Sequence, residues 1–343
     1  MPAVWLPYGS TSISIKIDHE DLAWVFPTRL NIGSPNYQEL NNVLKTSSRE
    51  GSLLLIDPTL PVQVKVFLRK SISENIMELV CFDMFNKDPS ENLSFKSACL
   101  LSRPHLDPLI EFRGLGENLL PFYPTLWRDF KTNLLDASKS QGVLSLKNYL
   151  NDLEKQVDLK LIMLTPWAED SILSTNNLIE AYEILNNFKE FLTAGLNPFV
   201  ELLLVSAGGE PFDESLSRAL SVFPNCLRDC ECDRILLIAE GTEGLGLDPE
   251  LFLKNISELE MPLILQYVAL CKSLLKDKTV HFVSATPEPL LKMMIDCKAY
   301  ETLLDAYKAS RLFLPKGSKT GIITHAPFAS VRLEKGFKMG GET

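Results

Sequence analysis

Short apolar segments of strand length alternate with amphipathic helical segments along most of this chain, and this alternation constrains the fold more than any single motif. Residues 52–56 are predicted as a strand, residues 57–59 as a polar turn, and residues 62–76 as a helix. The same order returns later, with a strand predicted over 199–205 and a helix over 213–222. Repeated strand–turn–helix units predict the α/β class.

The other predicted elements extend this pattern over both halves of the chain. Further strands are expected over residues 11–17, 77–84, 97–101, 159–164, 234–239, 280–283 and 321–323, and further helices over 145–157, 176–194, 249–256, 262–275, 287–297 and 300–310. Asp213 is expected at the N-cap of the helix over 213–222.

Chain length and one helix end suggest how the chain divides. A length of 343 residues suggests two domains. The helix over 176–194 ends at Gly195, and glycine commonly stops a helix. We therefore expect an N-terminal α/β domain over residues 1–196 and a C-terminal α/β domain over residues 197–312. Residues 313–343 are expected to supply a strand that returns to the N-terminal domain, and then a frayed tail.

Charge and hydropathy exclude several classes of partner. The net charge of −10 argues against nucleic acid or an anionic membrane surface as the main partner. The first residues lack the basic and apolar regions of a signal peptide. No apolar run approaches the about 20 residues that a membrane span needs. We therefore expect a cytoplasmic protein with no membrane partner; the oligomeric state is left open.

The cysteines do not form a recognisable framework. There are seven, an odd number, and most are scattered, so a disulfide scaffold is not expected. Cys226, Cys230 and Cys232 are close in sequence, and thiolates can bind zinc or iron–sulfur clusters. Their C-x3-C-x-C spacing is not a standard metal-binding pattern. We expect a helix-to-strand connection rather than a metal site, and the role of the cluster stays open.

Motifs of common enzyme classes are absent, and one glycine-rich turn stands out. Gly241, Gly244 and Gly246 follow the strand predicted over 234–239. Backbone N–H groups in such a turn can bind an anion, but the turn can equally be a tight connection to the next element. Both alternatives remain open.

Several segments together resemble the nickel-dependent lactate racemase (LarA-like) family. The opening Leu6-Pro7-Tyr8-Gly9 is similar to the start of that family, and the segment Asp57–Val62 resembles its D-H-T-R-P motif. Phe112-Arg-Gly114-Leu resembles its F-A-G-F segment, Gly208–Asp213 resembles its G-G-Y-P-L-D, and residues 240–246 resemble its A-G-A-R-D-G-H-G turn. The resemblance implies two α/β domains with a cleft between them.

The family's chemistry is hydride removal and return at the α-carbon of a 2-hydroxy acid. The resemblance implies a nickel-pincer nucleotide linked to a lysine, a histidine ligand to nickel, and two histidines as general acid and base. The cofactor lysine falls on Leu120 and the arginine before it on Leu119. One catalytic histidine falls on Ile110, the motif arginine on Leu60, and the nickel ligand near Asp136.

These replacements remove the groups on which the family's chemistry depends. Leucine cannot form the covalent link, and isoleucine cannot transfer a proton. More apolar side chains also predict a more apolar cleft wall, which disfavours a carboxylate ligand. We therefore expect no cofactor and no metal; the alternative is a nickel-pincer nucleotide on another lysine, Lys131 first.

Asp57 and Thr59 survive from the first motif, and the second domain keeps its turns. Candidate ligand-binding residues are Asp57, Thr59, Gly208, Gly209, Asp213, Gly241, Gly244 and Gly246. Each also has a purely structural alternative, since Asp57 and Thr59 can cap the following helix and the glycines can form turns. No catalytic residue is assigned.

Three hypotheses about function follow. The first is a divergent LarA-like protein without racemase activity, which binds a small molecule in the interdomain cleft or has an accessory role. The second is an enzyme of altered chemistry that uses Asp57, Thr59, His105, Arg113, Arg128 or Lys131. The third is a 2-hydroxy-acid racemase or epimerase, an isomerase, with displaced catalytic groups.

Overall fold

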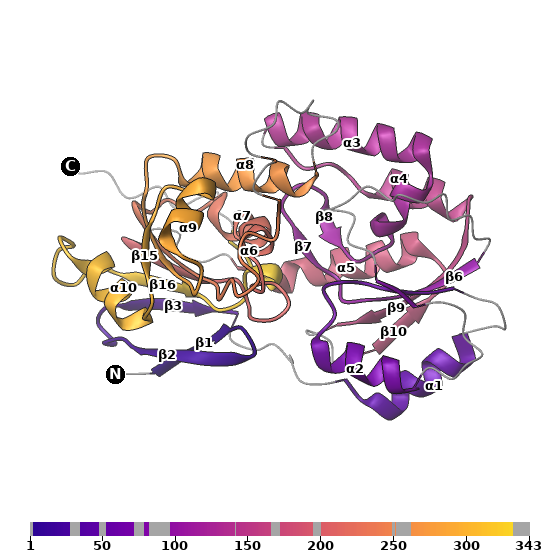
Figure 1. The fold of residues 1–343 in the computed structure, drawn as a ribbon, viewed down its shortest axis with the longest axis horizontal. Coiled ribbons are helices and arrows are strands. Elements are labelled where there is room, and N and C mark those ends of the chain that lie inside the picture. Colours follow the sequence, from indigo (N-terminus) through magenta and orange to yellow (C-terminus); the bar gives the residue numbers. More distant parts are fainter. Residues whose placement is uncertain are drawn as a thin grey trace, which may run out of the picture.

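The computed structural model arranges the chain as two groups of helices and strands that lie side by side (Figure 1). It describes residues 3–27, 35–47, 53–71, 79–81, 97–140, 142–165, 172–194, 200–248, 251 and 262–331. Each group is built around one sheet, and both sheets are mainly parallel.

The first sheet has five strands and is covered by helices on both faces. Its order is β10 (Ile172–Thr175), β9 (Asp158–Leu164), β6 (Ser97–Ser102), β4 (Leu53–Ile56) and β5 (Leu79–Cys81). Only β10, at one edge, runs antiparallel to its neighbour. Strands that are buried on both faces are apolar almost throughout, which explains runs such as LLLI in β4.

Alternate strand residues pack on different helices. Helices α1 (Tyr37–Ser47) and α2 (Val62–Ser71) share an apolar cluster with Leu54 and Ile56 on one face. On the other face, α3 (Pro124–Lys139), α4 (Lys147–Glu154) and α5 (Leu178–Leu192) belong to the cluster that contains Leu55. The period-two alternation of a strand thus assigns each side chain to its layer.

The second sheet has six strands in the order β15 (Lys298–Tyr300), β14 (Thr279–Val283), β13 (Arg234–Ile238), β12 (Leu202–Ser206), β16 (Thr320–Ile323) and β3 (Leu22–Phe26), and each pair is parallel. One face packs on α6 (Leu216–Val222), α7 (Pro224–Leu227) and α8 (Ile264–Leu275). The other packs on α10 (Leu303–Arg311) and on a hairpin of β1 (Ala3–Tyr8) and β2 (Thr11–Lys16). Helix α9 (Glu288–Met294) precedes β15.

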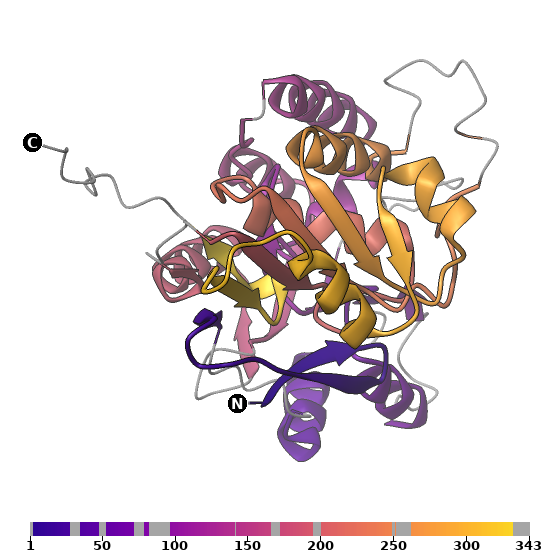
Figure 2. The ribbon, with the colours of Figure 1, turned by 90° about the vertical axis from the view of Figure 1, so that its left-hand side faces the viewer.

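The beginning of the chain lies with the second sheet (Figure 2). Strand β3 pairs with β16, with Gly321 opposite Trp24. A Cβ atom at Gly321 would lie 2.5 Å from Cζ2 of Trp24, so glycine is needed for the indole to pack there. Strand β3 thus joins the sheet of residues 202–323, and the hairpin of β1 and β2 packs on its face, although all three strands belong to the residues predicted as the N-terminal domain.

The late strand lies inside the second sheet. Strand β16 lies between β12 and β3, and β3 belongs to the residues predicted as the N-terminal domain. The two-residue β17 (Ser330–Val331) pairs with β11 (Thr193–Ala194), which follows α5. The predicted tail lies outside the described residues.

The α/β class is confirmed, and most predicted strands lie within two or three residues of their expected bounds. Most of the helix expected over 249–256 lies outside the described residues. The N-cap expected at Asp213 is wrong, because α6 begins at Leu216 after Ser215. None of the helices in the described ranges is long and apolar enough to cross a membrane.

Asp213 instead joins the N-terminal hairpin to the second sheet. Its Oδ2 atom accepts a hydrogen bond from Gly9 N at 2.7 Å, and Glu210 N donates to Gly9 O at 3.0 Å. Ser206 Oγ donates to Pro7 O at 2.8 Å. Two segments that both resemble the racemase family, Leu6–Gly9 and Gly208–Asp213, therefore hold each other in place. Burial raises the pKa of Asp213 above its ordinary value.

Replacing Asp213 will weaken this connection. We expect Asp213→Ala to lower the free energy of unfolding by about 1–3 kcal/mol, because the buried Gly9 N–H loses its acceptor. Asp213→Asn keeps one acceptor oxygen and will lose less. Urea unfolding measures both, with Asp158→Ala at an exposed position as the control. Equal losses for Asp213→Ala and the control would contradict this role.

Candidate functional site

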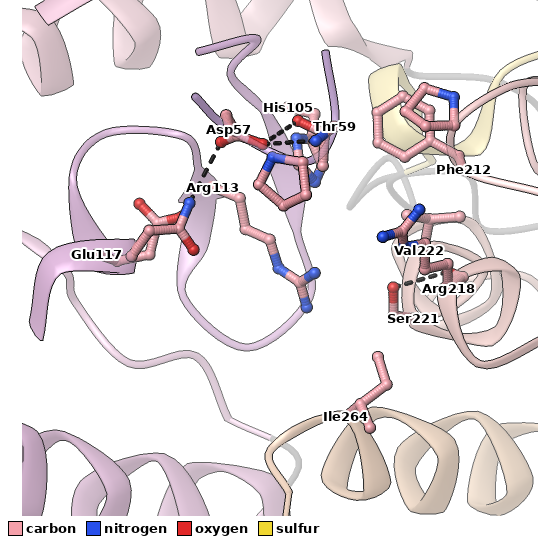
Figure 3. Close-up of a pocket in the computed structure, with 13 residues that line it drawn as sticks. Asp57, Thr59, His105, Arg113, Glu117, Phe212, Arg218, Ser221, Val222 and Ile264 are labelled. Carbon is pink, nitrogen blue, oxygen red and sulfur yellow. Dashed lines mark hydrogen bonds between the residues drawn. The ribbon is translucent and has the colours of Figure 1, made fainter. Parts of the chain in front are cut away.

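A pocket lies where the two groups of elements meet (Figure 3). It encloses about 520 Å³ of space between protein atoms, its open mouth included. Its lining residues are Asp57, Pro58, Thr59, His105, Arg113, Glu117, Asn118, Pro211, Phe212, Arg218, Ser221, Val222 and Ile264. The first seven belong to segments that pack with the first sheet, and the last six to segments of the second.

Parallel strands explain why the pocket forms at this place. Asp57 directly follows β4, and Pro211 and Phe212 lie in the loop that follows β12. In open α/β sheets, ligands commonly bind beyond the carboxyl ends of the strands. The two sheets thus direct such loops toward one pocket, and α6 and α8 close its other side.

Asp57 is a buried carboxylate with defined partners. Its Oδ1 atom accepts hydrogen bonds from Thr59 N at 2.7 Å and Thr59 Oγ1 at 2.5 Å. Its Oδ2 atom accepts one from Asn118 Nδ2 at 3.3 Å. These bonds close the turn before α2, which begins only at Val62. Asp57 and Thr59 therefore hold a turn at the pocket wall. They do not cap the helix, although capping was the structural alternative considered for them.

Glu117 is the second carboxyl of the pocket and is fully buried. It begins the short helix η1 (Glu117–Phe122), and its two oxygens accept hydrogen bonds from Gly114 N at 2.8 Å and Leu115 N at 2.9 Å. Burial, and then the charge of Asp57, raise the pKa of Glu117 to about 7. The Glu117 carboxyl therefore gains or loses a proton near neutral pH.

His105 presents a neutral imidazole. It lies in β7 (His105–Asp107), and its Nδ1 atom is 3.2 Å from Arg103 O, so that nitrogen carries the proton. The ring packs edge-on against Phe212 with centroids 5.0 Å apart. Burial, and then the positive charge of Arg113, lower the pKa of His105 to about 3. At neutral pH it can accept a hydrogen bond at Nε2 but carries no charge.

Arg113 is fixed by partners from both groups. It ends β8 (Glu111–Arg113), and its Nε donates to Asp107 Oδ2. Its guanidinium carbon lies 4.4 Å from the ring centroid of Tyr267, whose hydroxyl donates to Asp107 Oδ1 at 3.1 Å. Burial lowers the pKa of Arg113, but Tyr267 and Asp107 raise it more strongly. Arg113 is therefore a permanent, oriented cation in the pocket wall.

The opposite wall is formed in part by α6. Arg218 on α6 donates through Nη1 to Glu214 Oε2 at 2.6 Å, in an ion pair that is about one quarter exposed at the arginine. Ser221, one turn later, donates to Arg218 O at 2.7 Å. Both side chains face the pocket from the second group, so a bound molecule can contact the two groups at once (Figure 3).

The pocket wall contains charged side chains, but the surface that it exposes to the pocket is mostly apolar, as expected of a more apolar cleft. That expectation assumed that the replaced family positions line the cleft. Instead, Leu60, Ile110, Leu119 and Leu120 are at most 1% exposed and pack in the two apolar clusters of the first sheet. None of these four lines the pocket.

The predicted site residues separate into two sets. Asp57 and Thr59 line the pocket, whereas the other six predicted residues, Gly208, Gly209, Asp213, Gly241, Gly244 and Gly246, do not. All five glycines have φ between 68° and 98°, the region that favours glycine in turns. A Cβ atom at Gly241 would lie 2.3 Å from Thr286 Oγ1, and one at Gly246 would lie 2.4 Å from Ser215 Oγ. These positions favour the turn interpretation for the glycines.

Of the other residues named for an enzyme of altered chemistry, some line the pocket and some do not. His105 and Arg113 line the pocket, but Arg128 is exposed on α3 and does not. Lys131 is buried on α3, with its Nζ 5.4 Å from the ring centroid of Trp127, and it does not line the pocket.

The sequence analysis did not predict the lining residues Arg218, Ser221, Val222 and Ile264. It also missed Glu117 and Asn118. The available signal was their position after Gly114 and Gly116, in a loop already singled out by its resemblance to the racemase family. Within the described residues, no group of three or more histidine, cysteine or acidic side chains is placed to hold a metal ion.

Comparison with known proteins shows a similarity of fold. No family model and no curated protein matches the sequence. A solved structure, the lactate racemase apoprotein from Thermoanaerobacterium thermosaccharolyticum, matches with a TM-score of 0.59. The match covers 96% of this chain and 100% of that chain, at 13% sequence identity. The fold is similar to that of lactate racemase. At this identity the match shows a LarA-like fold and nothing about activity.

The buried carboxyl of Glu117 predicts a pH effect. Because its folded-state pKa of about 7 lies above the ordinary 4.5, the folded protein binds its proton more tightly than the unfolded chain does. The free energy of unfolding should therefore fall as pH rises through this range, by on the order of 3 kcal/mol. We expect Glu117→Gln to flatten that dependence in urea unfolding at pH 5 and pH 8.

Glu183→Gln is the matched control, since the side chain of Glu183 is 60% exposed. It should leave the pH dependence unchanged. An unaltered slope in Glu117→Gln would contradict the assignment.

Proposed function

We propose that this protein is a divergent member of the lactate racemase fold group that binds a small polar molecule in the pocket between its two sheets, without nickel-pincer racemase chemistry. The observation that carries the proposal is that the pocket is lined by one set of residues and the apolar replacements lie elsewhere, in the core. Polar and charged groups from both sheets meet at one pocket. The leucine and isoleucine that the resemblance aligns with the family's cofactor lysine and one catalytic histidine are buried in the core.

The pocket has the groups to bind a small polar ligand. Asp57 and Glu117 offer carboxyl oxygens, Arg113 and Arg218 offer guanidinium donors, and His105 offers a neutral ring nitrogen. Arg113 and Arg218 are each already paired with a carboxylate, Asp107 or Glu214, so their charges are balanced. These features favour a ligand with hydroxyl groups and at most one negative charge.

The residues present do not fit the family's cofactor. A pincer nucleotide needs a lysine at the pocket for its covalent link, and the pocket lining contains none. Leu120 and Leu119 stand at the implied attachment site, buried against other apolar side chains. Lys131, the alternative, packs against Trp127 away from the lining. This mismatch supports a binding or accessory role. Separately, the net charge of −10 supports the proposal of no nucleic acid or membrane partner. The cytoplasmic location stays a proposal.

One observation favours a second candidate, an enzyme of altered chemistry. Two carboxyls, Asp57 and Glu117, line the pocket, and burial and the charge of Asp57 raise the pKa of Glu117 to about 7. A carboxyl with a raised pKa is a common general acid or base. In this case Asp57→Ala would abolish turnover without unfolding the chain, whereas a binding protein has no turnover to lose.

The first test concerns the cofactor. The protein should be produced together with enzymes that make the nickel-pincer nucleotide, and then analysed by intact mass and metal content. We expect the mass of the unmodified chain and no stoichiometric nickel. A covalent mass increment with nickel near one per chain would overturn the proposal, and peptide mapping would show whether Lys131 carries the adduct.

The second test concerns the ligand. Thermal unfolding should be followed with a panel of small hydroxy acids that includes both lactate enantiomers. We expect at least one to raise the Tm, because a ligand at about 100 times its Kd stabilises by about 2.7 kcal/mol. Arg218→Ala should remove that rise, whereas Arg69→Ala, at an exposed position on α2, should keep it. No rise with any member would contradict ligand binding, and interconversion of the enantiomers would restore the racemase hypothesis.

A further inference from the structure

The segment between α7 and β13 brings two thiols into contact. Sγ of Cys230 and Sγ of Cys232 lie 3.8 Å apart, with one exposed residue, Glu231, between them. This segment has no helix or strand, and neither cysteine lines the pocket described above. The predicted helix-to-strand connection is therefore present, and its cysteines form a pair to which the proposed function assigns no role.

We propose that Cys230 and Cys232 form a redox-active dithiol that a peroxide converts into a disulfide within one loop. The two sulfur atoms need to approach from 3.8 Å to about 2 Å, which a segment without regular hydrogen bonding can accommodate. Only a single residue separates the cysteines, so closing the bond needs no movement of α7 or β13.

The chemistry balances with hydrogen peroxide as the oxidant. The Cys230 thiolate attacks one peroxide oxygen, the O–O bond breaks, and the departing hydroxide takes up a proton to become water. The Cys232 sulfur then attacks the resulting sulfenic acid, the S–O bond breaks, and a second water leaves. Together the two thiols lose two protons and two electrons, and these reduce the peroxide to two waters.

The surroundings favour Cys230 as the attacking thiol. The neighbouring Cys232 thiol lowers the pKa of Cys230, burial opposes this, and the positive charge of Lys278 lowers it further. Lys278 is held beside the pair because its Nζ donates to Cys232 O at 2.7 Å. A thiolate beside a lysine is the reactive form of cysteine.

Other cysteines of the described chain lack this combination. Cys226 and Cys271 are fully buried and Cys99 is 2% exposed, and burial raises the pKa of each above its ordinary value. Cys297 is 5% exposed, as are Cys230 and Cys232, but burial raises its pKa to about 12, and no described thiol contacts it. Cys297 is therefore a control with matched exposure and no partner.

The sequence provides a direct assay on the full chain. Trypsin cleaves after Arg228 and Arg234, so residues 229–234 form one peptide that contains Cys230 and Cys232 but not Cys226. The reduced protein should be treated with stoichiometric hydrogen peroxide, alkylated and digested without reductant. We expect this peptide to lose two hydrogen atoms, to resist alkylation, and to regain both thiols with dithiothreitol.

Two variants make the result specific. Cys232→Ser should leave Cys230 as a sulfenic acid that dimedone traps, while Cys297→Ser should form the disulfide as the unaltered protein does. Two alkylated thiols in the 229–234 peptide after peroxide would overturn the proposal. So would a crosslink of Cys230 to Cys226 or to a second chain, which mapping and a non-reducing gel would detect.

Discussion

The buried carboxylate of Asp107 is the interaction on which the arrangement of the two sheets most depends. It accepts the Nε–H of Arg113, the hydroxyl of Tyr267 from α8, and the backbone N–H groups of Leu109 and Ile110 at 2.7 and 2.9 Å. A buried charge is stable only when it is paired and hydrogen-bonded, and here its partners come from both groups of elements. The pairing fixes the β7–β8 hairpin against the second group, and that hairpin carries His105 and Arg113 into the pocket.

Neighbouring contacts extend this junction. Asn225 donates to Leu106 O at 2.9 Å, and Arg228 donates to Pro108 O at 2.8 Å, so the second group also binds the backbone around Asp107. The guanidinium of Arg103 lies 4.8 Å from the ring centroid of Phe328. These contacts join the two groups of elements next to the pocket, and they add to the hydrogen bonds of Asp107.

The sequence predicted elements well where the pattern is local. The apolar runs of β4, β9, β12 and β13 show the strand pattern directly, and the amphipathic face of α5 shows the helical one. At the site, Asp57 and Thr59 were found because a motif marks the end of β4. Glu117 was missed because its buried carboxyl depends on backbone donors within its own loop, which no residue pattern shows.

The sequence by itself determined the α/β class, most strands of the two sheets but not helices α1 and α3, and the leucines and isoleucine that the resemblance aligns with lysine, arginine and histidine of the racemase family. Only the tertiary structure decided that these side chains lie in the core, that β3 and β16 pair across nearly the whole chain, and that Asp213 binds Gly9 instead of capping α6. The physical reason is the sequence separation over which the interactions act. Periodicity and turns act over a few neighbouring residues, whereas strand pairing, burial and the partners of a buried charge are set by segments that meet only when the chain folds.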